Sequence, residues 1–350
     1  MRSNTVFTLL FAVVVVAVLI GEAYVYTVDD GRCSSGVSVT AGGIEYSVTS
    51  VGSDQYSVIV MDNGSFEKID SYYIYCDERY GSKVEKVPVP VGAKEFTQEY
   101  YISQLVKTLN NRGIHDIEIL NADELKDAMD ADISASKASV KGLIVLSGAL
   151  PETIYTGVSG DTIIDWIGNG GSLYWAGNVL GKYYGTSDGK VTEVAATVYG
   201  PLFNIDPVCI SDSDETVLSD INSNEFRYSL SLMNNRIKYG IDPSGLSVDF
   251  LSVGYTKDGY CSAVLYSYGN GMICVLAGDY SSNHRHDLVQ LVASGICYDT
   301  AQAGYADGEV KRGTVSGTID VSFVSGNNYA AYVYCGGYYT VYGKAEGWSA

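Results

Sequence analysis

The chain has few basic side chains and no basic cluster. Lys and Arg supply 22 residues against 41 Asp and Glu, which gives a formal net charge of −19. A protein that binds nucleic acid needs a basic face to neutralise phosphates. We therefore expect no nucleic-acid partner. Acidity of this size is typical of an exported protein that stays soluble and away from anionic surfaces.

Histidine and paired cysteines are also scarce. The chain contains three histidines and seven cysteines, and no two cysteines have C-x-x-C spacing. The sequence therefore predicts neither a zinc site nor a thioredoxin-type motif. Because the number of cysteines is odd, at least one thiol stays unpaired within the chain. We expect no metal and no cofactor.

Two further motifs are missing. Ser147 follows an apolar run, but Val145 and Ala149 stand where a G-x-S-x-G nucleophile elbow needs glycines. The acidic stretch 212–220 lacks the glycine and the spaced glutamate of an EF-hand loop. We therefore predict no serine nucleophile at Ser147 and a solvated acidic loop.

An apolar run covers residues 6–20, broken by Thr8. Arg2 precedes it, and Glu22, Asp29 and Asp30 follow it. This asymmetry predicts that the following chain lies outside the cytoplasm. Two alternatives remain open, namely a membrane anchor over residues 5–25 and a cleaved signal peptide. Both predict an extracytoplasmic protein, either anchored to the cell membrane or secreted.

The period of the apolar pattern divides the rest of the chain. Ile44, Tyr46 and Val48 alternate with polar residues, as do Ile319 and Val321. We predict a membrane or signal segment over 1–25, a small β module over 26–68, an α/β domain over 69–300 and a β-rich segment over 301–350. The last segment is too short for a complete sandwich. It either completes the first module or belongs to a longer β domain.

Between residues 69 and 300, short apolar runs alternate with helical patterns. The runs predict five strands: Tyr72–Cys76, Ile117–Leu120, Gly142–Leu146, Leu173–Trp175 and Met272–Ala277. Residues 178–271 read as a long excursion containing tyrosine and glycine, and Asn121 with Glu124 predicts a capped helix start. We therefore predict an α/β fold with a doubly wound, mainly parallel sheet, flanked by small β modules and an N-terminal membrane segment.

Three glycine-containing stretches carry a family resemblance. Residues 142–148 (GLIVLSG), 166–177 (WIGNGGSLYWAG) and 271–278 (GMICVLAG) resemble the class I glutamine-amidotransferase-like fold, a flavodoxin-like arrangement. The likeness covers about two-thirds of the chain, residues 70–298. A working member places a cysteine at a strand-to-helix elbow and a histidine after a late strand. This sequence has Gly177-Asn178 and Gly278-Asp279 there, so the resemblance implies a degenerate, non-catalytic member.

Candidate binding residues follow the predicted strands, because open α/β sheets bind ligands beyond the carboxyl ends of their strands. The candidates are Ser147, Gly177, Asn178, Asp279, His284 and His286. The two histidines are two residues apart at the start of a predicted helix. They do not share one face of that helix, so we assign no metal site to them.

Two functions fit these features. The first is an exported, membrane-anchored, non-catalytic surface protein with a binding or structural role, whose partner is a glycan or a cell-surface protein. Thirty tyrosines against eight phenylalanines suit such interfaces. The alternative is an exported hydrolase that acts on glycans or peptides through loop carboxylates, with Asp279, Asp161 and Glu152 as the candidates.

Overall fold

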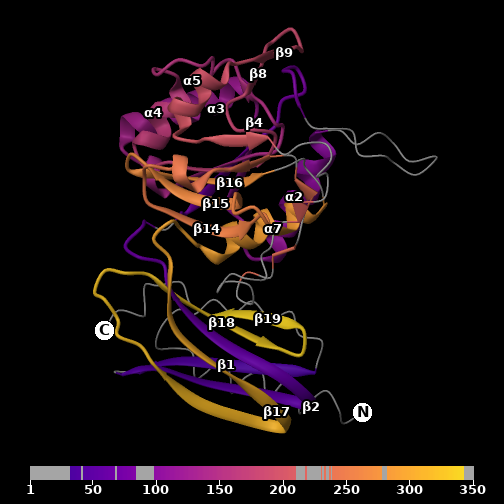
Figure 1. Ribbon diagram of the computed structural model, residues 1–350, viewed down its shortest axis with the longest axis vertical. Helices are drawn as coiled ribbons and strands as arrows, with labels where there is room; N and C mark the ends of the chain where they lie inside the picture. Colours follow the sequence, from indigo (N-terminus) through magenta and orange to yellow (C-terminus); the bar gives the residue numbers. More distant parts are fainter. Residues whose placement is uncertain are drawn as a thin grey trace, which may run out of the picture. The chain divides into compact units, whose positions relative to one another are not determined.

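The computed structural model describes residues 32–40, 42–67, 69–83, 98–209, 217–218, 230, 232–233, 236–237, 239–277 and 282–342. The chain forms two compact units (Figure 1). The first comprises Met1–Phe66 and Thr300–Ala350, and the second comprises Glu67–Asp299.

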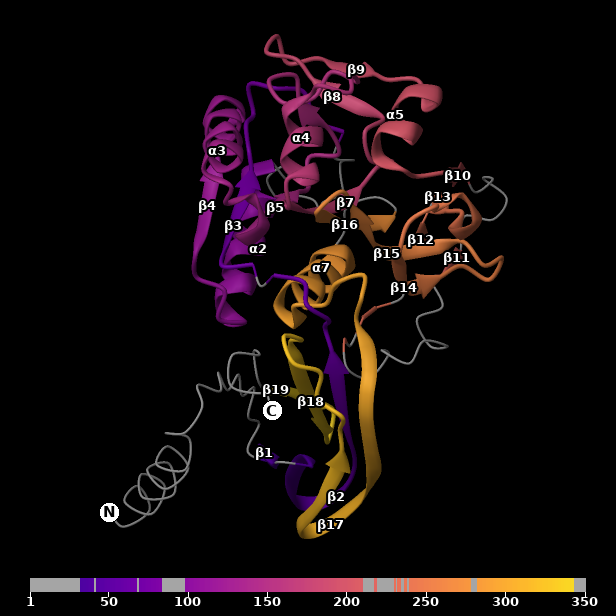
Figure 2. The same ribbon diagram turned by 90° about the vertical axis from the view of Figure 1, so that its left-hand side faces the viewer.

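The first unit is an antiparallel sheet organised around one long strand, β2 (Gly43–Asp62). Along one edge of β2 runs β17 (Ala301–Asp320), which pairs with it over its length. Along the other edge lie β1 (Cys33–Thr40) and then β18 (Tyr329–Cys335), and β19 (Tyr338–Tyr342) pairs with β18 (Figure 2). The two β-rich segments of the sequence therefore pair in one sheet.

The alternating pattern of β2 defines the core of this unit. Residues two apart, such as Val58 and Val60, point to the same face and are fully buried. The same cluster contains Ile44, Val48, Val310, Ile319, Tyr329, Ala331 and Val333. Near the end of β2 the other face is buried as well, since Ile59 and Met61 are also shielded from solvent.

The second unit contains a nine-stranded sheet. Its parallel half consists of β3 (Ser71–Tyr75), β4 (Ile117–Leu120), β5 (Lys141–Val145), β7 (Ser172–Gly177) and β16 (Gly271–Ala277). These are the five segments that the apolar runs predicted as strands. Their order in space is β4-β3-β5-β7-β16. It corresponds to 2-1-3-4-5 in chain order, the flavodoxin-like order.

The other half of this sheet is antiparallel. It consists of β10 (Pro207–Cys209), β13 (Tyr239–Ile241), β14 (Phe250–Tyr255) and β15 (Cys261–Tyr268). The tight turn between Tyr268 and Gly271 makes β15 antiparallel to β16, and β13 and β14 both pair with β15 in the antiparallel sense.

The predicted doubly wound, mainly parallel sheet is therefore wrong. The sheet is mixed, with four parallel and four antiparallel pairings. Of the described residues, 43% lie in strands and 23% in helices. The excursion over residues 178–271, assigned to no sheet from its sequence, supplies the antiparallel strands.

Helices cover both faces of the mixed sheet (Figures 1 and 2). On one side lie α3 (Ala122–Ala135) and α4 (Thr162–Gly168), and on the other α2 (Gln98–Asn111) and α7 (Ser282–Ser294). The remaining elements are α5 (Ala196–Phe203), η1 (Ala138–Val140), η4 (Pro243–Gly245), the pair β11 (Val217–Leu218) and β12 (Arg236–Ile237), and a small sheet of β6 (Leu150–Pro151), β8 (Tyr183–Gly185) and β9 (Val191–Glu193).

The predicted membrane-spanning helix also needs correction. No helix in the described part of the chain is long and apolar enough to cross a membrane. Residues 5–25, where that helix was predicted, lie outside the described residues. The expected membrane segment is therefore not part of the fold described here.

A buried carboxylate joins α3, α4 and β3. Asp132 on α3 accepts hydrogen bonds from Trp166 Nε1 at 3.1 Å and from the Tyr73 hydroxyl at 3.3 Å. Each donor is itself buried. A buried donor without an acceptor costs free energy, so the three side chains fix where the two helices lie against the sheet.

We predict that Asp132→Ala lowers the free energy of unfolding by about 2–4 kcal/mol, because it leaves two buried donors without an acceptor. The matched control is Asp130→Ala on the same helix, where the carboxylate is exposed and pairs with Lys126. It should change stability by less than about 0.5 kcal/mol. Urea denaturation followed by tryptophan fluorescence measures both. Equal stabilities of the two variants would contradict the assigned role of Asp132.

Candidate functional site

The candidate site lies at the carboxyl ends of the parallel strands. From β3 the chain first continues to β4 on one side and then returns to β5 on the other side of β3. The direction of the connections therefore changes between β3 and β5. In open α/β sheets, ligands bind in the crevice beside such a switch point. Three loops border it: residues 76–83 after β3, 146–149 after β5, and 177–180 after β7.

Three of the predicted site residues come together at this edge. The buried Ser147 hydroxyl donates to Ala149 O at 2.5 Å. Gly177 O and Asn178 O both accept from the Tyr239 hydroxyl, at 2.9 and 3.1 Å. Trp175 Nε1 also donates to Asn178 O, at 2.5 Å. These contacts fix the loop after β5 internally and hold the loop after β7 to β13.

Residues 82 and 83 are hydrogen-bonded to two of these loops. Lys83 N and Ser82 Oγ both donate to Ser147 O at 2.8 Å, and Asn178 Nδ2 donates to Lys83 O at 2.7 Å. On its other side this segment packs against the turn between β8 and β9, where Gly81 is needed because a Cβ there would overlap the carbonyl oxygen of Lys190. Residues 81–83, called the plug below, therefore lie against the loops after β5 and β7, at the edge where open α/β sheets bind ligands.

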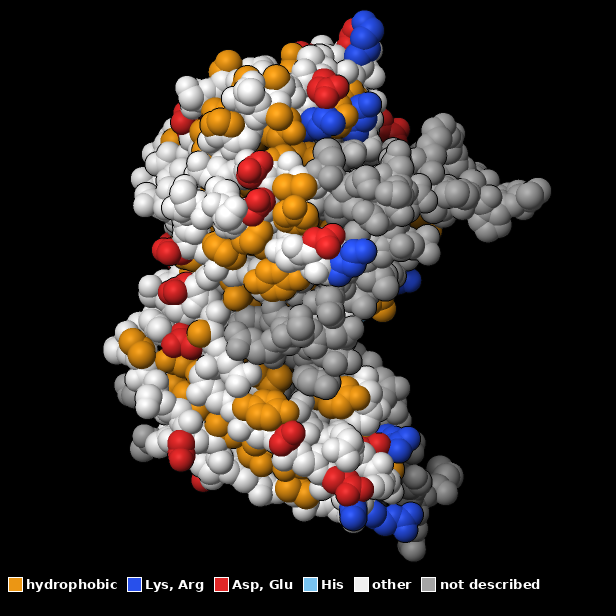
Figure 3. Space-filling view, viewed as in Figure 1, with side chains coloured by type: hydrophobic (Ala, Val, Ile, Leu, Met, Phe, Trp, Pro, Cys, Tyr) orange, Lys and Arg blue, Asp and Glu red, His pale blue; other side chains and the backbone are white. Residues whose placement is uncertain are grey.

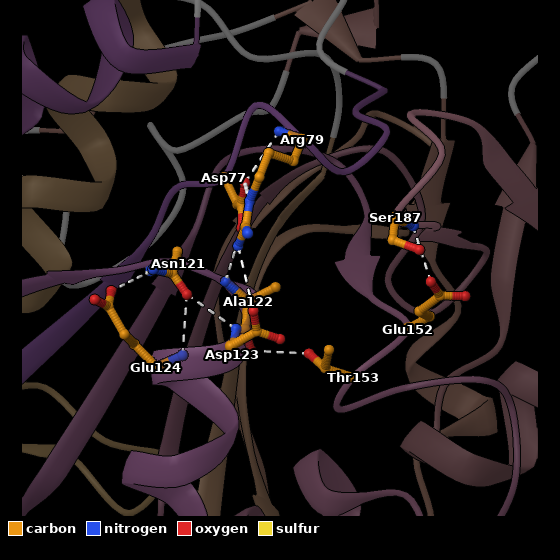
Figure 4. Close-up of polar contacts among 9 residues, drawn as sticks. All are labelled: Asp77, Arg79, Asn121, Ala122, Asp123, Glu124, Glu152, Thr153 and Ser187. Carbon is orange, nitrogen blue, oxygen red and sulfur yellow. Dashed lines mark hydrogen bonds and ion pairs between the residues drawn. The ribbon is translucent and has the colours of Figure 1, made fainter.

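A second polar cluster lies beside the plug (Figure 4). Asp77, two residues after β3, binds the Arg79 guanidinium through both carboxylate oxygens, with Nε–Oδ1 at 3.0 Å and Nη2–Oδ2 at 2.7 Å. It also accepts from the backbone nitrogen of Ala122 at 3.1 Å. Ala122 is the first residue of α3, so the carboxylate sits where a helix dipole favours negative charge.

The start of α3 is fixed by its own cap. Asn121 Oδ1 accepts from the backbone nitrogens of Asp123 and Glu124, and Glu124 Oε2 accepts from Asn121 N. The predicted capping box is confirmed. Thr153 Oγ1 donates to Ala122 O at 2.9 Å and ties the loop after β6 to the same helix end.

The electrostatics of this cluster favour ionised groups. The hydrogen bond from Arg79, against the opposing cost of burial, leaves the pKa of Asp77 below its usual range. Arg79 Nη2 lies 2.7 Å from Asp77 and 3.4 Å from Asp123, so one guanidinium lies between two carboxylates. Asp77 is therefore ionised at neutral pH and has both oxygens bound to Arg79, so it cannot act as a proton donor there.

Two of the carboxylates named as hydrolase candidates, Asp161 and Glu152, are hydrogen-bonded to backbone groups of neighbouring loops. Asp161 Oδ2 accepts from the backbone nitrogens of Thr156, Gly157 and Val158 at 2.8–2.9 Å. It therefore fixes the loop before α4. Glu152 Oε1 accepts from Ser187 N at 2.8 Å and links the loops after β6 and β8.

The remaining predicted residues lie elsewhere or outside the described part. His286 Nδ1 lies 3.1 Å from Asp287 Oδ1 on α7, and that oxygen also accepts from Met233 N at 2.8 Å. Asp279 and the side chain of His284 lie outside the described residues. No contact recorded for the described residues joins His286 to Ser147, Gly177 or Asn178.

Sequence reasoning missed Asp77 and Arg79. Both directly follow the predicted strand Tyr72–Cys76, the same position that singled out Ser147 and Asn178. The sequence signal that could have identified them is an acidic residue and a basic residue, two positions apart, just after a predicted strand. The described residues contain no group of three or more side chains suited to hold a metal ion.

Comparison with known proteins gives no family. No family model and no curated protein matches the chain. Among solved structures, an exo-β-1,4-mannosidase, Op5Man5, from Opitutaceae bacterium strain TAV5 is 10% identical, with 64% of this chain and 34% of that chain covered and a TM-score of 0.35. A β-galactosidase from Rahnella sp. R3 is 11% identical, with coverages of 79% and 41% and a TM-score of 0.37.

A third solved structure is matched over nearly its whole length, unlike the two glycosidases. The cytoplasmic protein STM3548 from Salmonella typhimurium is 13% identical, with 63% of this chain and 97% of that chain covered and a TM-score of 0.35. The chain thus spans well under half the length of the two glycosidases. Likenesses this weak carry no argument about activity, and the amidotransferase resemblance stays a prediction.

We predict that Asp77→Asn lowers the free energy of unfolding by about 1–2 kcal/mol at pH 7, because the Arg79 guanidinium and the start of α3 lose an anionic partner. The pKa of Asp77 is lower in the folded than in the unfolded chain. Its contribution is therefore present above pH ~4 and lost as pH falls through the lowered value. Urea midpoints of the variant and the parent should converge between pH 4 and pH 2.

Asp123→Asn is the matched control, since its exposed carboxylate meets the same guanidinium at 3.4 Å. It should leave stability nearly unchanged at every pH. A difference between Asp77→Asn and the parent that stays constant down to pH 2 would contradict the charge-based explanation.

Proposed function

We propose that this chain is an exported, non-catalytic protein that binds a glycan at the outer surface of the carboxyl-edge loops. The observation that carries the proposal is the plug of residues 81–83, hydrogen-bonded to Ser147 and Asn178. With the plug against these loops, a ligand is left with the surface formed around it. The proposed export rests on Arg2 before the apolar run and acidic residues after it.

The surface beside the plug has the chemistry of a sugar site. We define the tyrosine–lysine patch as Lys83, Lys182, Tyr183 and Tyr184. Lys83 Nζ lies 4.8 Å and Lys182 Nζ 5.3 Å from the centre of the Tyr183 ring, and both tyrosines of β8 are half-buried. Figure 3 shows basic, acidic and apolar side chains interspersed at this end of the unit.

Such a surface suits a glycan for physical reasons. Tyrosine offers an apolar ring for the C–H face of a sugar and a hydroxyl for hydrogen bonding. Ammonium groups held by a ring supply donors to sugar hydroxyls without a large ordering cost. Glu193, 3.6 Å from Lys182 Nζ, adds an acceptor at the rim.

Glycan hydrolysis is the second candidate. The observation that favours it is that Asp77 and Glu152 on loops and Asp123 at the start of α3 lie at one edge of the sheet (Figure 4). A glycosidase needs one carboxyl group that keeps its proton and a second that is ionised. The lowered pKa of Asp77 and its pairing with Arg79 argue against the first of these roles. We therefore rank hydrolysis below glycan binding.

We predict that the purified chain is retained by at least one immobilised polysaccharide and that Tyr183→Ala weakens the retention about tenfold, the loss expected when one aromatic contact is removed. Tyr305→Ala is the matched control, an exposed tyrosine in the other unit. Affinity electrophoresis across neutral and acidic polysaccharides measures both. Retention by none of them, or an equal loss in both variants, would contradict the proposal.

The same preparation tests for catalysis. We expect no release of reducing ends from the retained polysaccharide and no glutaminase turnover, because Gly177 and Asn178 occupy the turn where the family resemblance puts a thiol. Release of reducing ends that Asp123→Asn or Glu152→Gln abolishes would favour the hydrolase.

A further inference from the structure

Two cysteines meet where β1 and β18 adjoin along one edge of β2. Cys33 opens β1 opposite Ser50, and Cys335 closes β18 opposite Tyr56. β1 runs away from this junction and β18 runs into it, so the two residues stand at facing strand ends. Between their partners on β2 lie residues 51–55, where the pairing of β2 with β17 also shifts register.

The Cys33 thiol lies against the backbone beside Cys335. A Cβ on Gly336, the residue after Cys335, would lie 2.8 Å from Cys33 Sγ and 3.4 Å from Asp54 Oδ1. Cys33 Sγ also donates to Asp54 Oδ2 at 3.8 Å. Two cysteines about 300 positions apart in the sequence are thus neighbours at this junction.

We propose that Cys33 and Cys335 are a redox pair that closes to an intramolecular disulfide. The oxidant is a disulfide of a small thiol or of a thiol oxidoreductase. One thiol displaces half of that disulfide and forms a mixed disulfide, releasing one reduced thiol. The second cysteine then attacks the bonded sulfur and releases the other. Both cysteines lose a proton and together two electrons, and the oxidant is reduced to two thiols.

The surroundings set the order of the two steps. Cys33 is half-buried, whereas Cys335 is 4% exposed. Burial, reinforced by the hydrogen bond with Cys33, raises the pKa of Cys335 to about 12. Cys33 is therefore the thiol that reacts first with the oxidant, and Cys335 is the one that resolves the mixed disulfide.

The neighbouring charges are balanced. Arg32 Nη2 lies 2.8 Å from Asp54 Oδ1, and Ser50 Oγ also donates to this carboxylate. The Asp54 charge facing the thiols is thus neutralised by Arg32. The described residues hold no third ligand that would make this pair a metal site.

A bond here would tie together the ends of the first unit. β1 is held by β2 along one edge, and the disulfide would bind its first residue to the β18–β19 hairpin. The closed loop of about 300 residues contains the whole second unit. Restricting so long a loop in the unfolded chain predicts a large gain in stability.

The test uses the full chain equilibrated in oxidised glutathione and then mapped by mass spectrometry without reduction. We expect a linked pair of peptides containing Cys33 and Cys335. Reduction should lower the melting temperature of the first unit by roughly 5 °C or more. Cys335→Ser should accumulate glutathione on Cys33, because the resolving thiol is gone.

Cys76→Ser is the matched control, a half-buried cysteine of the other unit. It should keep the linked peptides and the reductant-dependent melting shift, while Cys33→Ser should lose both. The proposal is overturned if the folded parent chain, in oxidised glutathione, leaves Cys33 and Cys335 open to alkylation or links either to another cysteine. The peptide map of the parent decides this even where a serine variant fails to fold.

Discussion

The arrangement of the second unit depends on where the backbone groups at the carboxyl ends of its parallel strands find hydrogen-bond partners. Within the strands, the backbone groups are hydrogen-bonded to the neighbouring strands. Beyond the strand ends, Ser147 O accepts from Lys83 N and Ser82 Oγ, and the Tyr239 hydroxyl donates to two successive carbonyls after β7. An unpaired buried carbonyl is costly. The plug and Tyr239 supply these partners from within the chain.

Much of the parallel half could be predicted because its strands are buried on both faces. A strand such as β7 reads as a continuous apolar run, bounded here by glycines. The capping box at Asn121 and Glu124 was equally legible, because it is a local interaction between residues three apart.

The antiparallel half could not be predicted from the same signals. Period and apolar content identify a strand, but they do not say which neighbour it pairs with or in which direction. β15 is fully apolar over much of its length, as a parallel strand would be, yet the short turn to β16 makes it antiparallel. Pairing between β2 and β17 joins residues about 260 positions apart, a relation that no local pattern contains.

The candidate site was predictable in position but not in chemistry. Ser147 and Asn178 were correctly expected at the carboxyl edge, since residues that follow parallel strands share it. What they do there depends on Lys83, which was not among the predicted site residues. The partners of Asp77 come from Arg79 and from the start of α3, and a sequence does not reveal such convergence between a loop and a helix end.

Three buried carboxylates show the same use of charge. Asp54 is bound by Arg32 and Ser50, Asp77 by Arg79 and Ala122 N, and Asp161 by successive backbone nitrogens. A carboxylate surrounded by donors is stable as an anion and has little capacity left for substrate. In this acidic chain the buried acids therefore serve the fold. In the proposed glycan site, recognition would fall to side chains that keep exposed surface, and on β8 those are the two tyrosines beside the plug.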